Sequence, residues 1–111
     1  MKRHEVEAAI ARKCVRIILQ SGYKISVYDG EEWALKRSSS FSEITSAMFS
    51  TEADLLVIRD NADKKIGSVY LVHGNGSDIV SDYSSDNLEY MELLLEPVSI
   101  YADKLAMQHN V

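Results

Sequence analysis

The chain has 111 residues, a formal net charge of −5, a hydrophobic fraction of 46% and a charged fraction of 26%. This length predicts a single domain, residues 1–111, with a core that needs no disulfide or metal, and the composition excludes an intrinsically disordered chain. The acidic surplus argues against a protein that binds nucleic acid mainly through phosphate contacts, but it leaves a local basic patch open.

The cysteine count and the hydropathy of the sequence indicate the cellular compartment of the protein. Cys14 is the only cysteine, so an internal disulfide is excluded and a reducing compartment is expected. Charged residues such as Glu5, Glu7 and Arg12 interrupt the first apolar residues, which argues against a signal peptide. No apolar run is long enough to span a bilayer. We therefore expect a cytoplasmic protein without a membrane partner.

A helix and a hairpin are expected first. Apolar residues recur at helical spacing from Glu5 to Gln20, with Cys14 on the apolar stripe as a small buried hydrophobe. Gly22 suits a left-handed helix end. The segment 23–37, YKISVYDGEEWALKR, predicts a β-hairpin.

The register of this hairpin can be argued from parity. Only an odd loop gives one consistent apolar face, because it places Ile25 opposite Trp33. We therefore expect a three-residue loop, residues 28–30, with Gly30 left-handed in a bulge. In this register Trp33 belongs to the core and Lys36 faces water.

The middle of the chain predicts a short helix and three strands. Ser40 and Glu43 form a capping box that opens a helix reaching about Ser50. Residues 53–83 then read as a β-meander with two short turns. Consecutive apolar residues in its first two strands predict that both faces of these strands are at least partly covered. The helices can cover one face, and the missing cover for the other suggests a dimer.

The last helix is expected from Asp86 onward, with Glu89 completing a capping box. Pro97 predicts a kink or the start of a second helix. Apolar residues cover more than half of its circumference, including a separate stripe of Leu93, Ile100 and Met107. Such a helix needs more than one neighbour, which again suggests a homodimer; a short coiled coil is the alternative. The acidic strip of this helix comprises Glu89, Glu92, Glu96 and Asp103.

The element order is therefore helix-β-β-helix-β-β-β-helix. It predicts an α+β fold with a mainly antiparallel sheet of about five strands, packed against the N- and C-terminal helices.

Motifs for catalysis or metal binding are weak. His73-Gly74-Asn75-Gly76 resembles a phosphate loop, but it leads into a strand, so we interpret it as a tight connection. The aspartates at residues 60–63 and 78–86 read as turn and cap residues, since a calcium loop needs more ligands. No catalytic residue, metal site or cofactor is predicted.

Two surface features remain as binding candidates. One joins Tyr28, Trp33, Lys36 and Arg37 on the hairpin, because aromatic and arginine side chains are typical interaction anchors. The other is charge separation between the basic first helix and the acidic strip of the last helix, which could pair within a chain or across a dimer. The residues of this second feature are Arg12, Lys13, Arg16, Glu89, Glu92 and Glu96.

The pattern GYKISVYDGEEWALKRS, with IRD at Arg59 and DY at Asp82-Tyr83, resembles small uncharacterised bacterial proteins, some carried on prophages or other mobile elements. The resemblance covers most of the chain and implies no activity, substrate or catalytic residue.

Three functions are open at this point. We expect a non-enzymatic protein-interaction or regulatory module that acts as a homodimer. One alternative is a small-molecule binder or minor enzyme with a pocket near Tyr70, His73 and Tyr83. The other is a role linked to nucleic acid, either through the basic residues 12, 13 and 16 or through imitation of phosphates by the acidic strip.

Overall fold

The computed structural model describes residues 1–110 and contains the predicted elements in the predicted order. The elements are α1 (Arg3–Gln20), β1 (Lys24–Tyr28), β2 (Trp33–Ser38), α2 (Phe41–Ala47), β3 (Ala53–Arg59), β4 (Lys65–Val72), the 3-10 turn η1 (Gly76–Asp78), β5 (Val80–Ser84) and α3 (Leu88–His109). The strands form one antiparallel sheet in the order β2-β1-β3-β4-β5. The α+β prediction is confirmed.

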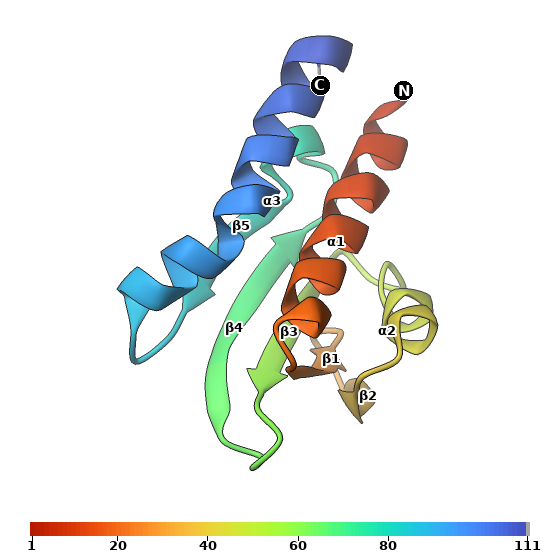
Figure 1. The fold of residues 1–111 in the computed structure, drawn as a ribbon. Helices are drawn as coiled ribbons and strands as arrows, with labels where there is room; N and C mark the ends of the chain where they lie inside the picture. The colour runs from red at the N-terminus through yellow and green to blue at the C-terminus, as the bar shows by residue number, and fades with distance from the viewer. Residues whose placement is uncertain (111) are drawn as a thin grey trace.

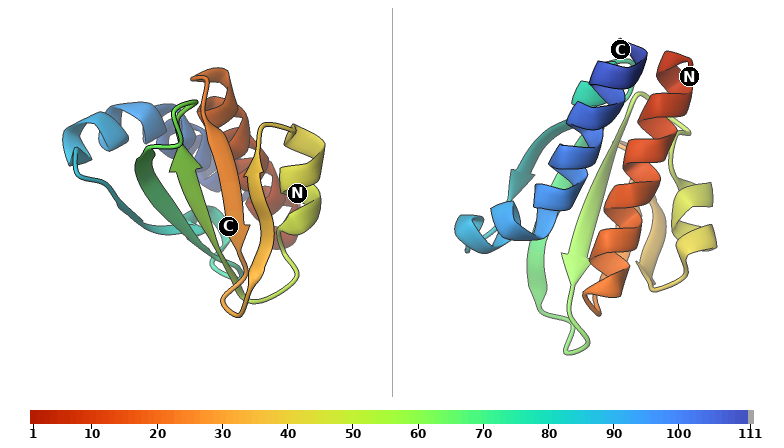
Figure 2. Two further views of the ribbon diagram at one scale, coloured as in Figure 1. Left: turned by 90° about the horizontal axis from the view of Figure 1, so that it is seen from below. Right: turned by 45° about the horizontal axis from the view of Figure 1, so that its top comes forward.

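All three helices lie on one face of the sheet (Figures 1 and 2). α1 and α3 cross it side by side in opposite directions, and α2 lies beside α1 above the β2 edge. Both chain ends lie at one end of the molecule, where the Met1 amino group is 3.2 Å from His109 Nδ1. Within residues 1–110, no helix combines the length and apolar character needed to cross a bilayer.

The core lies between the sheet and the helices. Strand residues that point to the helices are fully buried, because alternate side chains of a strand share one face. They are Ile25, Val27, Leu56, Ile58, Val69 and Leu71. Cys14 lies in the same layer, and burial raises the pKa of its thiol to about 12. The prediction of a small buried hydrophobe at Cys14 is confirmed.

The β1–β2 hairpin differs from the predicted register. Tyr28 pairs with Trp33, so the loop has four residues, and Val27 pairs with Leu35. Asp29 Oδ1 accepts hydrogen bonds from the amides of residues 31 and 32, each at 2.9 Å, and this turn replaces the predicted bulge. Two register shifts in β2 then change the parity on which the prediction depended. The hairpin itself, the exposure of Lys36 and the left-handed Gly30, at φ +101°, are confirmed.

The observed helix ends differ slightly from those predicted from the capping residues. Ser40 Oγ accepts a hydrogen bond from Glu43 N at 3.3 Å, which confirms the cap, although α2 ends at Ala47 instead of Ser50. The predicted Asp86 cap of α3 is wrong by one residue: Asn87 Oδ1 accepts the bond from Tyr90 N, at 3.1 Å.

Pro97 lies inside one continuous helix, α3. Figure 1 shows the first turns of α3 at an angle to the rest. Proline lacks the amide that would bond to the carbonyl four residues earlier, which accounts for a bend without a break.

Candidate functional site

The face of the sheet opposite the helices is open, and its residues form rows across the strands. Directly paired residues of neighbouring strands share a face. The first row is polar only at its β5 end and comprises Trp33, Tyr28, Leu55, Tyr70 and Asp82. Trp33 and Tyr70 are 44% and 42% exposed. We call this set the aromatic row.

A row of small residues runs beside the aromatic row. It comprises Ser26, Val57, Ser68 and Ser84, which pair across β1, β3, β4 and β5. Ser26 Oγ accepts a hydrogen bond from Arg37 N at 2.8 Å, and Ser68 and Ser84 are joined through their hydroxyls at 2.7 Å. These short side chains lie at two depressions, one lined in part by Ser26 and one by Ser68 and Ser84, and we call the row the small-residue channel.

A basic row follows on the other side of the small residues. Lys24 pairs with Arg59 across β1 and β3. A depression of about 170 Å³ is lined by Ser26, Trp33, Lys36, Arg37 and Arg59. Arg37 forms an ion pair with Asp63 at 2.9 Å, so it is partly neutralised. The predicted hairpin group Tyr28, Trp33, Lys36 and Arg37 therefore comes together and gains Lys24 and Arg59.

A second exposed surface is the apolar stripe of α3. Leu93, Ile100 and Met107 are 63%, 60% and 87% exposed and recur every seven residues. An open groove of about 440 Å³ separates this stripe from α1 and is lined in part by Lys13, Pro97 and Tyr101. The exposed apolar side chains of the stripe therefore lie beside a groove.

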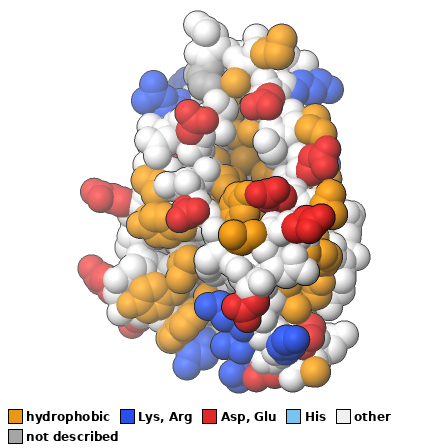
Figure 3. Space-filling view, turned by 90° about the vertical axis from the view of Figure 1, so that its left-hand side faces the viewer, with side chains coloured by type: hydrophobic (Ala, Val, Ile, Leu, Met, Phe, Trp, Pro, Cys, Tyr) orange, Lys and Arg blue, Asp and Glu red, His pale blue; other side chains and the backbone are white. Residues whose placement is uncertain are grey.

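Charges border the stripe on both sides. Asp103 lies on its β5 side, whereas Glu96, Lys104 and, from α1, Lys13 line the groove on its α1 side. Figure 3, seen from the side of α3 and β5, shows hydrophobic and acidic side chains mixed over most of this surface. Lys and Arg side chains gather mainly toward its lower end, near the β3–β4 turn.

The basic residues of α1 are not paired with the acidic strip. Within residues 1–110, the ion pairs are Arg37–Asp63 and His73–Asp54, so none joins α1 to α3. Instead Lys13 Nζ lies 5.7 Å from the centre of the Tyr101 ring and Arg16 Cζ lies 4.9 Å from that of Phe41. Arg12, Glu89, Glu92 and Glu96 are exposed.

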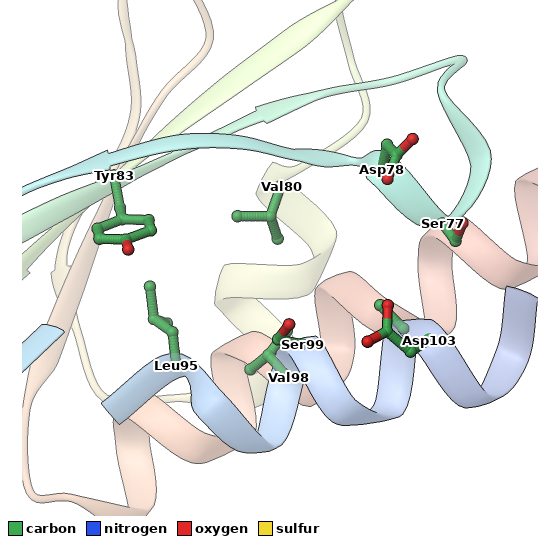
Figure 4. A pocket seen from close by; sticks show the side chains of 9 residues that line it. Ser77, Asp78, Val80, Tyr83, Leu95, Val98, Ser99 and Asp103 are labelled. Carbon is green, nitrogen blue, oxygen red and sulfur yellow. The ribbon is translucent and has the colours of Figure 1, made fainter. Parts of the chain in front are cut away.

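A cleft of about 220 Å³ separates β5 and η1 from α3. Figure 4 shows Asp78 and Ser77 from the loop and Ser99 and Asp103 from α3 around one part of it, with Tyr83 above Leu95 at the other. Burial and the neighbouring Glu92 carboxylate raise the pKa of the Tyr83 phenol. Pockets for drug-sized ligands usually measure about 300–1,000 Å³, so this cleft is smaller than a typical ligand pocket.

Of the three residues of the alternative pocket, Tyr70 and Tyr83 both line a depression of about 160 Å³, and His73 does not. Tyr83 also lines the β5–α3 cleft, and Tyr70 lies on the open face. His73 Nε2 lies 2.7 Å from Asp54 Oδ2, in a buried pair with the Phe49 ring stacked on the imidazole. Asp54 Oδ2 also accepts a hydrogen bond from Phe49 N at 2.9 Å. This pair ties the ends of β3 and β4 together.

The Gly-x-Gly loop binds an anion from its own chain. The Glu7 carboxylate is buried and accepts hydrogen bonds from Gly74 N and Gly76 N, both at 2.9 Å. The amides that could hold a phosphate are thus occupied by a helix side chain. The interpretation of the loop as a connection is confirmed.

The aspartate-rich turns are also structural. Asp60 Oδ1 accepts hydrogen bonds from Ala62 N and Lys64 N, each at 2.9 Å, and so closes the β3–β4 turn. Among the residues that the structure describes, no group of three or more His, Cys, Asp or Glu side chains could hold a metal ion.

Comparison of the chain with protein-family models, curated proteins and solved structures finds no match. The resemblance to uncharacterised bacterial proteins stays a prediction, and the surfaces above are the basis for function.

The sequence did not reveal that Lys24 and Arg59 belong to the hairpin group. Their association depends on the β1–β3 pairing, which joins strands 25 or more residues apart. The alternation of Lys24, Ser26 and Tyr28 with buried residues was the one local signal for a shared face.

Proposed function

We propose that the chain is a protein-interaction module that pairs with a second copy through the apolar stripe of α3. The observation that carries the proposal is the exposure of Leu93, Ile100 and Met107 at seven-residue intervals. Large apolar side chains gathered on one exposed face mark binding surfaces more often than scattered ones do. Burial of each side chain contributes about 1.5–3 kcal/mol before the entropic cost of association.

Charge complementarity favours a second copy as the partner. A two-fold axis parallel to α3 brings the acidic side of each stripe against the α1 side of the other. Asp103 of one copy then faces the groove of the other, which carries Lys13 and Lys104 together with Glu96. These cations and carboxylates form no ion pair within residues 1–110. Their pairing across the dimer would fix how the two stripes are aligned.

The same proposal places the module in the cytoplasm. Cys14 is the only cysteine and its buried thiol is free, which suits a reducing compartment.

Light scattering coupled to size-exclusion chromatography, over a range of concentrations, tests the dimer. Ile100→Glu puts a charge in the centre of the stripe, and we expect it to weaken the dimer at least about tenfold, equivalent to 1.4 kcal/mol or more. Leu88→Glu is the matched control, because Leu88 is an exposed leucine of α3 outside the stripe. A monomer at all concentrations, or equal effects of both variants, would contradict the proposal.

A further inference from the structure

The open face of the sheet has a chemical order that neither the fold nor the dimer requires. The aromatic row, the small-residue channel and the basic row run in parallel across the strands. A ligand in this channel contacts flat rings on one side and cations on the other. The face is also on the opposite side of the sheet from α3, so the proposed dimer leaves it free.

We propose that this face binds a short stretch of single-stranded nucleic acid, laid across the strands along the small-residue channel. Bases would stack on Trp33 and Tyr70, and phosphates would lie toward Lys36 and Arg59. Stacking on aromatic side chains and contact of the backbone with cations are the two contributions that hold single strands without sequence preference. A duplex cannot use the aromatic row, because its bases are already stacked on each other.

The dimensions fit this ligand. Neighbouring strands are about 4.8 Å apart, so the four strands β2, β1, β3 and β4 span roughly 14 Å. Open sheets of this width stack about two or three bases. Two depressions interrupt the channel, one of about 170 Å³ beside Trp33 and one of about 160 Å³ beside Tyr70. Each lies next to an exposed ring, as alternate stacked bases require.

The charge distribution favours a polyanion on this face despite the net charge of −5. Lys24, Lys36 and Arg59 have no acidic ion-pair partner within residues 1–110, and Arg37 shares its charge with Asp63. The acidic strip lies on α3, on the other side of the sheet. This asymmetry would orient the molecule with its open face toward phosphates. Asp82 at the β5 end of the aromatic row limits the bound segment to the part over β2, β1, β3 and β4.

An acidic peptide is the main rival ligand. It would engage the basic row, but it has no flat rings for Trp33 and Tyr70 unless aromatic residues recur at the right intervals. The test therefore includes a polyglutamate peptide of matched length and charge.

The experiment measures the fluorescence anisotropy of labelled oligothymidine and oligouridine of about 12 nucleotides at about 50 mM salt. Trp33 is the only tryptophan, so quenching of its emission reports stacking at the proposed place. We expect binding that weakens steeply with salt, together with quenching. Comparison of the two oligonucleotides shows whether the sugar matters.

Variants locate the site. Lys36→Glu with Arg59→Glu should weaken binding at least about tenfold, and Tyr70→Ala should weaken it about five- to tenfold while keeping the tryptophan reporter. Arg12→Glu with Arg16→Glu is the matched control, since it makes the same charge change on α1 and should alter binding less than about twofold.

Several outcomes would overturn the proposal: no binding at low salt, equal losses in both double variants, binding without quenching, or tighter binding of polyglutamate or duplex. Circular dichroism shows whether each variant is folded. A variant whose fold is lost is replaced by Lys36→Gln with Arg59→Gln. The dimer proposal fails separately, because Ile100→Glu should still bind the oligonucleotide and the open-face variants should still pair.

Discussion

The two faces of the sheet use the same strands for opposite purposes. On the covered face, every central position of β1, β3 and β4 is an apolar residue fully buried under α1 and α3, apart from Gly67 and Asp54. On the open face, the residues between them form an aromatic row, a channel and a basic row. Packing dictates the first face, whereas nothing in the domain's own core accounts for the order of the second.

The difference shows what a run of apolar residues means in this chain. Residues 55–58 of β3 are all apolar, but only Leu56 and Ile58 point to the helices. Val57 is buried on the open face by its neighbours in the rows, not by another layer. The second apolar face is therefore compatible with an uncovered sheet surface, and the helices do not need to cross over to cover it.

The largest effect should come from one of two adjacent leucines that lie on opposite faces of the sheet. Leu56→Ala removes a fully buried side chain from the core, and we expect it to lower the free energy of unfolding by about 2–5 kcal/mol. Leu55→Ala makes the same chemical change on the open face and should cost about 1 kcal/mol or less. Urea denaturation followed by circular dichroism measures both.

The ratio of the two effects is the informative quantity. Equal costs at Leu55 and Leu56 would mean that the open face is covered in solution, for example by a second copy. A concentration-dependent cost at Leu55 would point to the same conclusion. Either result would move the dimer interface from α3 to the sheet.

A smaller effect should come from the polar anchor of the covered face. Glu7→Ala leaves the amides of Gly74 and Gly76 without an acceptor, and the buried position of Gly76 keeps water away. We expect a loss of about 3 kcal/mol in the free energy of unfolding, measured by urea denaturation.

Glu5→Ala is the matched control for Glu7→Ala. Glu5 is an exposed glutamate of the same helix and accepts one hydrogen bond, from Lys2 N at 3.2 Å, so its loss should cost under about 1 kcal/mol. If both variants lose the same stability, the Gly-x-Gly loop does not depend on Glu7, and its amides are available to an external anion.

Much of the fold could be predicted because its signals are local. Helical periodicity, the Ser40 cap and the turn aspartates each depend on residues a few positions apart. The hairpin register failed for a physical reason: two bulges in β2 change which residues face each other, and no propensity marks a bulge at Arg37, whose φ is +50°. Trp33 was consequently assigned to the core, although it lies on the open face.

The candidate surfaces also differ in whether they could be predicted from the sequence. The α3 stripe could be predicted, since Leu93, Ile100 and Met107 follow from one helix alone. The open-face rows could not, because they join residues of five strands through a register that only the folded sheet defines. Likewise, no sequence spacing relates Glu7 to Gly74.

The smallest expected effect concerns a hydrogen bond between α3 and the residue just before β1. The Tyr23 hydroxyl, before β1, is hydrogen-bonded to the Tyr90 hydroxyl of α3. This bond, followed by burial and the neighbouring charges, raises the pKa of Tyr23 to about 12 from its ordinary value of 10.0. The folded protein therefore keeps a proton that the unfolded chain releases between pH 10 and pH 12, so stability falls as pH rises through this window.

Tyr90→Phe removes the bond, and alkaline titration of tyrosine absorbance measures the result. We expect one phenol to titrate closer to pH 10, and the decline in stability over the same window to become shallower. Tyr70→Phe is the control on the open face, where the Tyr70 hydroxyl makes no hydrogen bond to another side chain within residues 1–110. In this variant the Tyr23 phenol should keep its raised pKa. If one phenol still titrates near pH 12 in Tyr90→Phe, burial and not the bond to Tyr90 raises the pKa of Tyr23. That bond would then not hold α3 against the sheet at this place.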